Sequence, residues 1–422
     1  MRRSPYNLRR REAAERMINM SFYNAYCRTY QAVLKLGNYF LGYHMPDYIE
    51  GPGCVRQLPE LLQKAGIRSV LLVTGPNITR RGLHRGLMDA LRDAGIDYTV
   101  YNDIGANPTS DMVEAGVSLY REKGCEGIIA FGGGSPMDCA KAIGGRIARP
   151  GKTVAQLQGL LKVFRKIPPF YAVPTTAGSG SETTVAAVIT DSTTHRKAAI
   201  MDPHLIPRCT VLDPELTVGL PPFTTACTGM DALSHAVEAY TNHTYNTALE
   251  NDLAHQAVRL IYDNLMADYR DGSDLAARQN MQKAAFFAGR AFTRGCVGYV
   301  HAVGHTVSGL HNVAHGLAMA VLLPKVMRQY GPAAHRKLAE LADVCGISGS
   351  DESEKANAFI DWMEQMNRDM GIPEHLDMIE PGDIPQMIAW AMAEGNPLYP
   401  TPVIWREEDF RKLIYTARGE RK

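Results

Sequence analysis

Hydrophobic and polar positions divide the chain into two regions with different periods. From residue 46 to about 220, short apolar runs alternate with amphipathic stretches such as 81–95. The runs at 69–74, 98–102, 127–134 and 170–176 are typical of strands buried on both faces. Shorter candidate strands follow at 184–191, 197–202 and 208–214. This alternation predicts βαβ units, and therefore an α/β domain with a parallel sheet and helices on both sides.

After residues 216–222 the pattern becomes helical and stays so to the C-terminus. The stretches 224–240, 245–269 and 276–294 repeat their apolar positions every three or four residues. Pro221 and Pro222 mark a linker. We therefore predict a nucleotide-type α/β domain at 46–217 and an all-α domain at 218–422, with a ligand-binding cleft between them.

The first 45 residues form a third segment that is rich in arginine and aromatic residues. Basic residues gather at 2–3 and 9–11, but Glu12 and Glu15 argue against a transit peptide. A helix is favoured, docked either on its own domain or on a second subunit. The residues expected on its apolar stripe are Phe22, Tyr26, Tyr30 and Leu34.

Composition and charge narrow the class of partner. With 45 basic and 44 acidic residues among 422, the formal charge is only +1, so no electrostatic argument favours nucleic acid. The eight cysteines are scattered and include no C-x-x-C pair, which suits reduced thiols in the cytoplasm. No apolar run approaches the ~20 residues that span a bilayer. We expect a soluble homodimer or higher homo-oligomer that binds small molecules.

Two glycine-rich turns each follow a candidate buried strand. The first, at 132–134, leads into a helix, for which we expect Ser135 as N-cap and Asp138 as the acidic partner of a capping box. The second, at 174–184, offers several hydroxyl groups. Turns and helix N-termini at the carboxyl ends of parallel strands bind phosphate, so one extended phosphate-bearing cofactor is indicated, with a mononucleotide as the alternative.

Two histidine-containing segments have spacings that suit a metal. Asp231 and His235 lie one helical turn apart on one face, although an isolated D-x-x-x-H is more often an ordinary helix pair. His301 and His315 would be ~21 Å apart on one helix, so they can share an ion only if the chain turns between them. Gly309 and Asn312 offer that break.

One Asp and three His would form a mixed oxygen and nitrogen site suited to Fe²⁺, Zn²⁺ or a similar ion. His305 projects near His301 and could carry protons. His311 falls in the presumed turn and is interpreted as structural.

Five segments, taken in order, resemble the iron-containing (group III) alcohol dehydrogenases. They are 131–144, 173–184, 211–222, 228–240 and 298–324, and the resemblance extends over about 46–422. It implies a Rossmann-like domain that binds NAD or NADP and a helical domain that holds Fe²⁺, with Zn²⁺ possible. The implied reaction is reversible hydride transfer between the nicotinamide and a primary alcohol or aldehyde whose oxygen the metal binds.

The resemblance also implies roles for single residues. The implied metal ligands are Asp231, His235, His301 and His315, and the implied catalytic residue beside the substrate is His305. The implied cofactor-binding residues are Gly133, Gly134 and Ser135 at the pyrophosphate, Thr175 and Thr176 near the nicotinamide, and Asn107 and Lys197 at further positions.

Three departures from the family pattern bear on specificity. Gly75 stands after the first strand where many members carry Asp, whose carboxylate would repel the 2′-phosphate of NADP, so NADP becomes admissible here. Thr306 and Ala314 replace the common prolines next to His305 and His315 and leave the ligand set intact.

Other functions would explain some of the same residues. A metal-dependent hydrolase or lyase that activates water explains the Asp and histidines but leaves both glycine turns unused. A related alternative keeps this fold but catalyses a different reaction, as the resemblance to dehydroquinate synthase, metal-free maleylacetate reductase and polyol dehydrogenases implies. A non-catalytic assembly subunit is favoured only by the unusual N-terminal helix. A bound nicotinamide cofactor would separate the first alternative from a dehydrogenase.

Overall fold

The computed structural model describes residues 5–105, 107–193 and 197–420, and its N-terminal half contains a six-stranded parallel sheet. The strands are β1 (Asp47–Glu50), β2 (Ser69–Val73), β3 (Asp97–Tyr101), β4 (Gly127–Gly132), β6 (Phe170–Pro174) and β9 (Cys209–Leu212). Their order is β1-β9-β6-β4-β2-β3, and every pairing is parallel. The four principal predicted strands are confirmed as β2, β3, β4 and β6.

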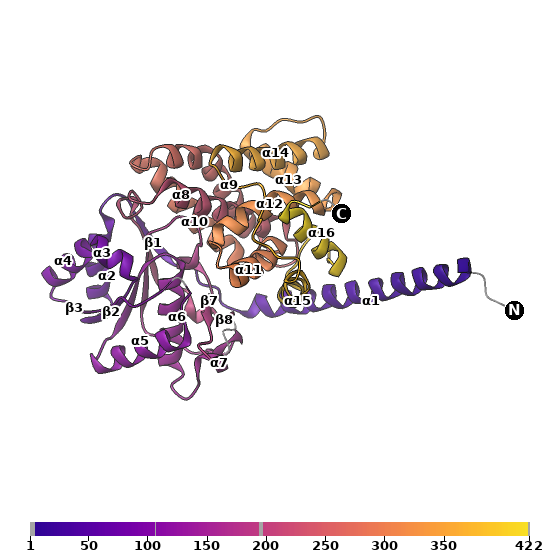
Figure 1. Ribbon diagram of the computed structural model, residues 1–422. Helices are drawn as coiled ribbons and strands as arrows, with labels where there is room; N and C mark the ends of the chain where they lie inside the picture. The colour runs from indigo at the N-terminus through magenta and orange to yellow at the C-terminus, as the bar shows by residue number, and fades with distance from the viewer. Residues whose placement is uncertain (1–4, 106, 194–196, 421–422) are drawn as a thin grey trace.

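Successive residues of the central strands supply two different cores. Leu71 and Ile128 join one apolar cluster, while Leu72 and Ile129 join another on the opposite face. Helices α5 (Ser110–Glu122) and α6 (Gly134–Ala148) cover the first face, and α2 (Leu58–Lys64) and α4 (Arg85–Asp93) cover the second (Figure 1). Burial on both faces explains why these strands are continuous apolar runs rather than alternating ones.

The shorter strands divide between two sheets. β7 (Ala186–Thr190) and β8 (Lys197–Met201) form an antiparallel pair, and β5 (Gly159–Leu160) adds to β8 in a separate three-stranded sheet. β9 instead joins the main sheet between β1 and β6. Two short helices, α3 (Pro76–Arg81) and α7 (Val154–Leu157), complete this half.

The C-terminal half is helical, and no strand follows residue 222 in the part of the chain that is described. Its helices are α8 (Pro222–Thr241), α9 (Ala248–Arg270), α10 (Leu275–Gly295), α11 (Tyr299–His311), α12 (His315–Tyr330), α13 (Pro332–Cys345), α14 (Glu352–Asp369), α15 (Ile384–Gly395) and α16 (Glu407–Arg418). The α/β half followed by a helical half confirms the predicted fold class.

Helix α8 is the centre of this half, because α9, α10 and α12 all pack on it. It is buried on every side from Thr225 to Thr241, apart from the half-buried Thr228. A helix surrounded in this way normally carries only apolar residues, yet α8 also buries Asp231, His235 and Glu238. These polar side chains need partners inside the protein, and they identify where the functional site is built.

Helix α1 (Pro5–Phe40) runs away from the body of the molecule towards its N-terminus (Figure 1). Near its C-terminal end it lies on the loop after α15, where the amide of Gln31 donates to the carbonyl oxygens of Pro397 and Tyr399, both at 2.9 Å. The expected single stripe is wrong: Tyr30 and Leu34 are half-buried towards the body, but Phe22 and Tyr26 are exposed. Arg2 and Arg3 lie outside the described residues.

All eight cysteines are free, which agrees with the prediction that the chain has no disulfide framework. Within the described ranges, no helix combines the length and apolar character needed to cross a bilayer.

Candidate active site at the histidine cluster

Three residues from three helices converge at one point. Asp231 on α8, His301 on α11 and His315 at the start of α12 offer ligand atoms that all lie within 4.8 Å of one another. The Oδ1 atom of Asp231 is 3.7 Å from Nε2 of His301 and 3.4 Å from Nε2 of His315. These separations are the ones that a single small cation would bridge.

The chain reversal that brings His301 and His315 together is confirmed. Helix α11 ends at His311, Asn312 adopts a left-handed conformation with φ 51°, and α12 starts at His315. Two details of the prediction are wrong: Gly309 lies inside α11, and His311 lies in its last turn rather than in the connection. His311 points its Nε2 atom at Asp383, 3.5 Å away, which agrees with a structural role.

Glycines allow the helices to approach closely enough for this convergence. A Cβ atom on Gly316 would lie 2.3 Å from the carbonyl oxygen of Cys227 on α8. A Cβ atom on Gly304 would lie 2.2 Å from Cε of Met319 on α12. Since real Cβ atoms do not come so close to backbone, the residue after His315 has to be glycine for α12 to reach α8 in this arrangement.

His235 lies beside this group. Its ring stacks between those of Phe292 and His301, at centroid distances of 4.2 and 4.4 Å. Its Nδ1 atom is 4.0 Å from Oδ1 of Asp231. His235 is thus adjacent to the three converging residues but outside the 4.8 Å group, and its role as a fourth ligand stays a prediction.

Several buried atoms in the cluster have no hydrogen-bond partner. They are Oδ1 of Asp231, Nδ1 of His235 and Nε2 of His301. Leaving such atoms unpaired costs roughly 1–3 kcal/mol each, so their concentration at one place calls for another partner. One carboxylate oxygen with imidazole nitrogens is a donor set for Fe²⁺ or Zn²⁺, and these residues therefore fit a divalent metal.

The charges in the cluster favour an ionised Asp231 beside neutral rings at His235 and His315. Burial opposes ionisation of Asp231, but the surrounding histidines hold its pKa well below the ordinary value. Burial lowers the pKa of His235 to about 3 despite the neighbouring carboxylate, and burial likewise lowers the pKa of His315. Neutral imidazole is the form that binds metals.

Glu238 orients His301 from behind. One carboxylate oxygen is 2.5 Å from Nδ1 of His301, and the other accepts from the backbone N–H of Val300 at 2.7 Å. Burial opposes a charged ring, but Glu238 and Asp231 together raise the pKa of His301 to about 9. A carboxylate at Nδ1 places the remaining proton there and leaves Nε2 free to face the cluster. Glu238 was not predicted from the sequence, although its position seven residues after Asp231 puts both on one helix face.

His305 lies at the more open side of the cluster. Its ring is next to that of His315, with centroids 5.3 Å apart, and its Nδ1 atom is 2.7 Å from the carboxylate of Glu394 on α15. The hydroxyl of Tyr399 donates to the same oxygen at 2.8 Å. His305 keeps 36% of its side chain exposed, whereas His301 keeps 2%, so His305 alone of these two can exchange protons with a ligand or with water. No motif pointed to Glu394 or Tyr399.

The two glycine turns face each other. A Cβ atom on Gly133 would lie 3.2 Å from Oγ1 of Thr176, and one on Gly134 would lie 3.5 Å from Oγ of Ser179. The predicted capping box is wrong, because α6 already begins at Gly134 with Gly133 as N-cap. Ser135 therefore lies in the first turn of α6, where backbone N–H groups and the positive end of the helix dipole suit an anion.

Asp138 binds residues outside α6 instead of capping this helix. It accepts from the hydroxyl of Ser181 at 2.8 Å and from the backbone N–H of Val188 at 3.0 Å. The fully buried Lys141, which sequence analysis also missed, donates from Nζ to both oxygens of Ser181 and of Thr184. These contacts tie α6 to the second glycine turn and fix the distance between the two turns.

The second turn also packs directly against the helix that carries Asp231. A Cβ atom on Gly178 would lie 2.7 Å from Cβ of Thr228, which precedes Asp231 by one turn of α8. A Cβ atom on Gly180 would lie 2.7 Å from Cα of Gly289 on α10. A ligand held by the glycine turns therefore ends beside the histidine cluster.

The remaining predicted cofactor residues belong to the second turn and to three other segments of the α/β half. Gly75 is the N-cap of α3 directly after β2, and Thr175 is buried at the end of β6. Asn107 is exposed in the loop before α5, and Lys197 is exposed at the start of β8. No hydrogen bond between described residues joins Asn107 or Lys197 to the turns, so their roles stay predictions.

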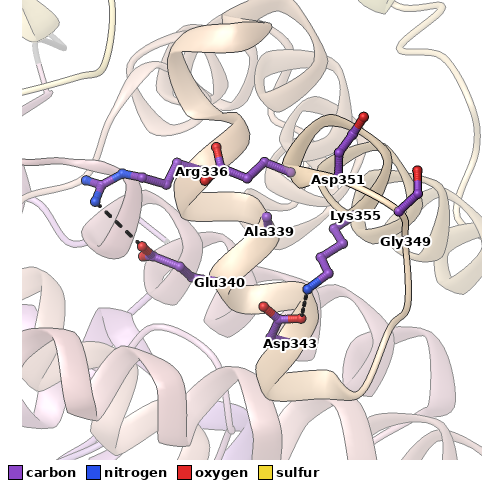
Figure 2. A pocket seen from close by; sticks show the side chains of 9 residues that line it. Arg336, Ala339, Glu340, Asp343, Gly349, Asp351 and Lys355 are labelled. Carbon is purple, nitrogen blue, oxygen red and sulfur yellow. Dashed lines mark hydrogen bonds and ion pairs between the residues drawn. The ribbon is translucent and has the colours of Figure 1, made fainter.

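A charged cavity of about 360 Å³ between α13 and α14 is separate from this site. Figure 2 shows its opposite charges paired, Arg336 with Glu340 and Lys355 with Asp343. None of its lining residues belongs to the glycine turns or to the histidine cluster.

Comparison with known proteins finds family models that match both halves of the chain. The family described as iron-containing alcohol dehydrogenase matches residues 46–214, and the C-terminal domain described for the same family matches 225–418. The chain is 38% identical over 373 residues to the 1,3-propanediol dehydrogenase of Klebsiella pneumoniae, across 84% of this chain and 95% of the relative.

Solved structures are similar over nearly the whole chain. The crystal structure of a 1,3-propanediol oxidoreductase has a TM-score of 0.86 at 34% identity, and the match covers 90% of this chain and 100% of the other. The sulfoacetaldehyde reductase of Bifidobacterium kashiwanohense, solved in complex with NAD⁺, has a TM-score of 0.79 at 27% identity, with 90% and 99% covered.

Proposed function

Because the chain belongs to the iron-containing alcohol dehydrogenase family and is an oxidoreductase of alcohols and aldehydes, we propose specific roles for the residues described above. Asp231, His301 and His315 hold the divalent metal, and His235 completes the ligand set. The observation that carries this assignment is the group of unpaired buried atoms on Asp231, His235 and His301.

The metal, when bound, supplies Lewis acidity that polarises a carbonyl oxygen and stabilises an alkoxide. The protein's own groups prepare the place for it. Asp231 contributes a negative charge, and Glu238 fixes the tautomer of His301. His305 moves the proton of the substrate oxygen at its Nε2 atom, while Glu394 holds its Nδ1 atom.

The glycine turns bind a nicotinamide dinucleotide. Gly133, Gly134 and Ser135 receive the pyrophosphate at the N-terminus of α6, and Thr175 and Thr176 lie towards the nicotinamide end. A relative with a similar structure binds NAD⁺, which supports this class of cofactor. Gly75 supplies no carboxylate against a 2′-phosphate, so we propose that NADP is accepted as well as NAD. Asn107 and Lys197 are further cofactor positions by resemblance.

The substrate is a short primary alcohol or diol and its aldehyde, as the 1,3-propanediol dehydrogenase relatives suggest. We also propose that the protein works in the cytoplasm, where its free thiols stay reduced, and that it forms a homo-oligomer.

The test is anaerobic reconstitution of the full chain with Fe²⁺ or Zn²⁺, followed by alcohols and aldehydes assayed with NADH and NADPH in parallel. Asp231→Asn and His301→Ala should each lose metal and activity, while His335→Ala on α13 should retain both. If both cluster variants keep full activity, the proposed site is wrong.

A further inference from the structure

Helix α1 is longer than the surface that the protein offers to cover it. Its 36 residues extend over about 54 Å, and its N-terminal part leaves the body altogether (Figure 1). Among the described side chains of α1, at 21–38 and 40, the buried ones are Cys27 and Gln31, which lie on one face near the C-terminal end. Arg28 strengthens the contact with the body by donating to the carbonyl oxygens of Thr401 and Pro402.

The opposite face of the same helix is apolar and exposed. We call its five large side chains the outer stripe, and each is between 55% and 78% exposed. They are Phe22, Tyr26, Val33, Leu36 and Phe40. Thirteen large apolar side chains are exposed in the described part of the chain, so more than a third of them lie on this one helix face. Such a concentration marks an interaction surface rather than scattered exposure.

The spacing of the outer stripe indicates what kind of surface it fits. The exposed Thr29 lies between Tyr26 and Val33 on the same face. Counted with it, the six positions from 22 to 40 follow one another at steps of four, three, four, three and four residues, which is a heptad spacing. A narrow stripe of this period is the seam of paired helices, whereas a helix lying on a membrane has a broader apolar face. The small Ala25 and Ala32 flank the stripe and allow a second helix to come close.

We propose that the outer stripe pairs with the outer stripe of a second copy of this chain. The area agrees with such a pair. If pairing buries roughly 100–140 Å² of exposed surface on each of the five side chains, the stripe loses about 600 Å² of exposed surface per copy. Two copies then bury about 1,200 Å², the lower end of the range for specific interfaces. A stripe that meets its own symmetry equivalent is self-complementary, as a two-fold dimer requires.

Charge does not oppose this pairing. The outer stripe contains no side chain that is charged at neutral pH, and Arg28 is held against the body by its two hydrogen bonds. The inference rests on the homo-oligomer proposed above but not on the proposed chemistry, because no member of the outer stripe belongs to the histidine cluster or the glycine turns. Loss of pairing and loss of activity are therefore separable outcomes.

The experiment measures the mass of the full chain by sedimentation velocity and light scattering over a range of concentrations. The variant Tyr26→Gln/Val33→Gln/Leu36→Gln should dissociate at least 100-fold more readily than wild type. The control Leu249→Gln/Leu275→Gln, at exposed apolar positions of α9 and α10, should assemble as wild type does. Circular dichroism and activity per chain, measured on both, should match wild type, since the substituted side chains are exposed.

Unchanged assembly of the triple variant overturns the proposal, as does a wild-type chain that is monomeric throughout. Wild type that stays monomeric but floats with phosphatidylserine vesicles would assign the stripe to a membrane instead, and would also overturn it. A second measurement needs no loss of assembly: Thr29→Cys/Val33→Cys should form a covalent dimer on mild oxidation whether the helices run parallel or antiparallel. Absence of that dimer, with wild type as control, overturns the pairing.

Discussion

Replacement of Glu238 by glutamine tests how the protein prepares His301 for a metal. The carboxylate presents two acceptor oxygens to two buried donors, Nδ1 of His301 and the backbone N–H of Val300. Glutamine has nearly the same shape but only one acceptor oxygen. Whichever way the amide is turned, its NH₂ group faces one of these donors. If that donor is His301, its proton is forced to Nε2, the atom that we propose as the metal ligand.

The expected magnitude follows from this geometry. One buried donor without an acceptor costs about 1–3 kcal/mol, and outer partners of ligating histidines typically contribute 10- to 100-fold in metal affinity. We therefore expect Glu238→Gln to bind metal about 10- to 100-fold more weakly while the chain stays folded.

The assay is competition with a chromophoric chelator for Zn²⁺ or Co²⁺, which reports metal affinity without relying on turnover. Glu340→Gln is the matched control: Glu340 also contacts α8, through the hydroxyl of Tyr240, and the carbonyl of glutamine can keep that single bond. An affinity of Glu238→Gln within about twofold of wild type would refute the reasoning, because the partner of His301 would then have no influence on its ligating atom.

Three further predictions follow from the same structure. Gly316→Ala should lower metal affinity by at least tenfold in the same chelator titration, because its Cβ atom would lie 2.3 Å from a carbonyl oxygen of α8. Gly309→Ala in the adjacent α11 is the control and should leave affinity unchanged, because its Cβ atom would meet open space. Gly75→Asp should shift the NADPH-to-NADH ratio of kcat/KM at least tenfold towards NADH; an unchanged ratio would contradict the assignment of Gly75 to the ribose site. Lys141→Met should lower the unfolding free energy by about 3–5 kcal/mol in urea titrations, since buried acceptors would lose their charged donor. Lys152→Met, at a half-buried lysine whose hydrogen bond lies at the surface, should cost under about 0.5 kcal/mol.

The parts of the fold that were predictable are those where burial leaves a clear period. Strands β2 and β4 are apolar on both faces, so they stood out as continuous runs. Strand β1, with exposed ends and only two half-buried positions, has no such run and was missed. Strand β7 alternates between buried and half-buried residues, which is the mark of an antiparallel strand with one covered face. That alternation could have separated it from the main sheet.

Helical spacing predicted the positions of some site residues but not of others. It placed Asp231 and His235 on one face and required the turn before His315, because distances along a helix are fixed by its rise. It did not find Glu238 or Lys141, since charged residues in a helix usually face water and only tertiary packing reveals that these two are buried. It also left the ring of His235 undetermined: a position on a helix face does not fix side-chain rotation, and the ring stacks between two neighbours.

The convergence of the cluster depends on glycine as much as on histidine. Gly298 lies against the carboxylate of Glu238, where a Cβ atom would come within 2.8 Å, and Cβ atoms on Gly304 and Gly316 would come within 2.2 and 2.3 Å of Met319 and Cys227. Each of these glycines stands next to, or one turn from, a residue of the site in the sequence. Glycine inside an apolar helix costs about 1 kcal/mol relative to alanine, so Gly304 in α11 and Gly316 in the first turn of α12 are best explained by helices that must come close. The ligand geometry is therefore set by helix packing, and substitutions that touch no ligand, such as Gly316→Ala, should disturb it.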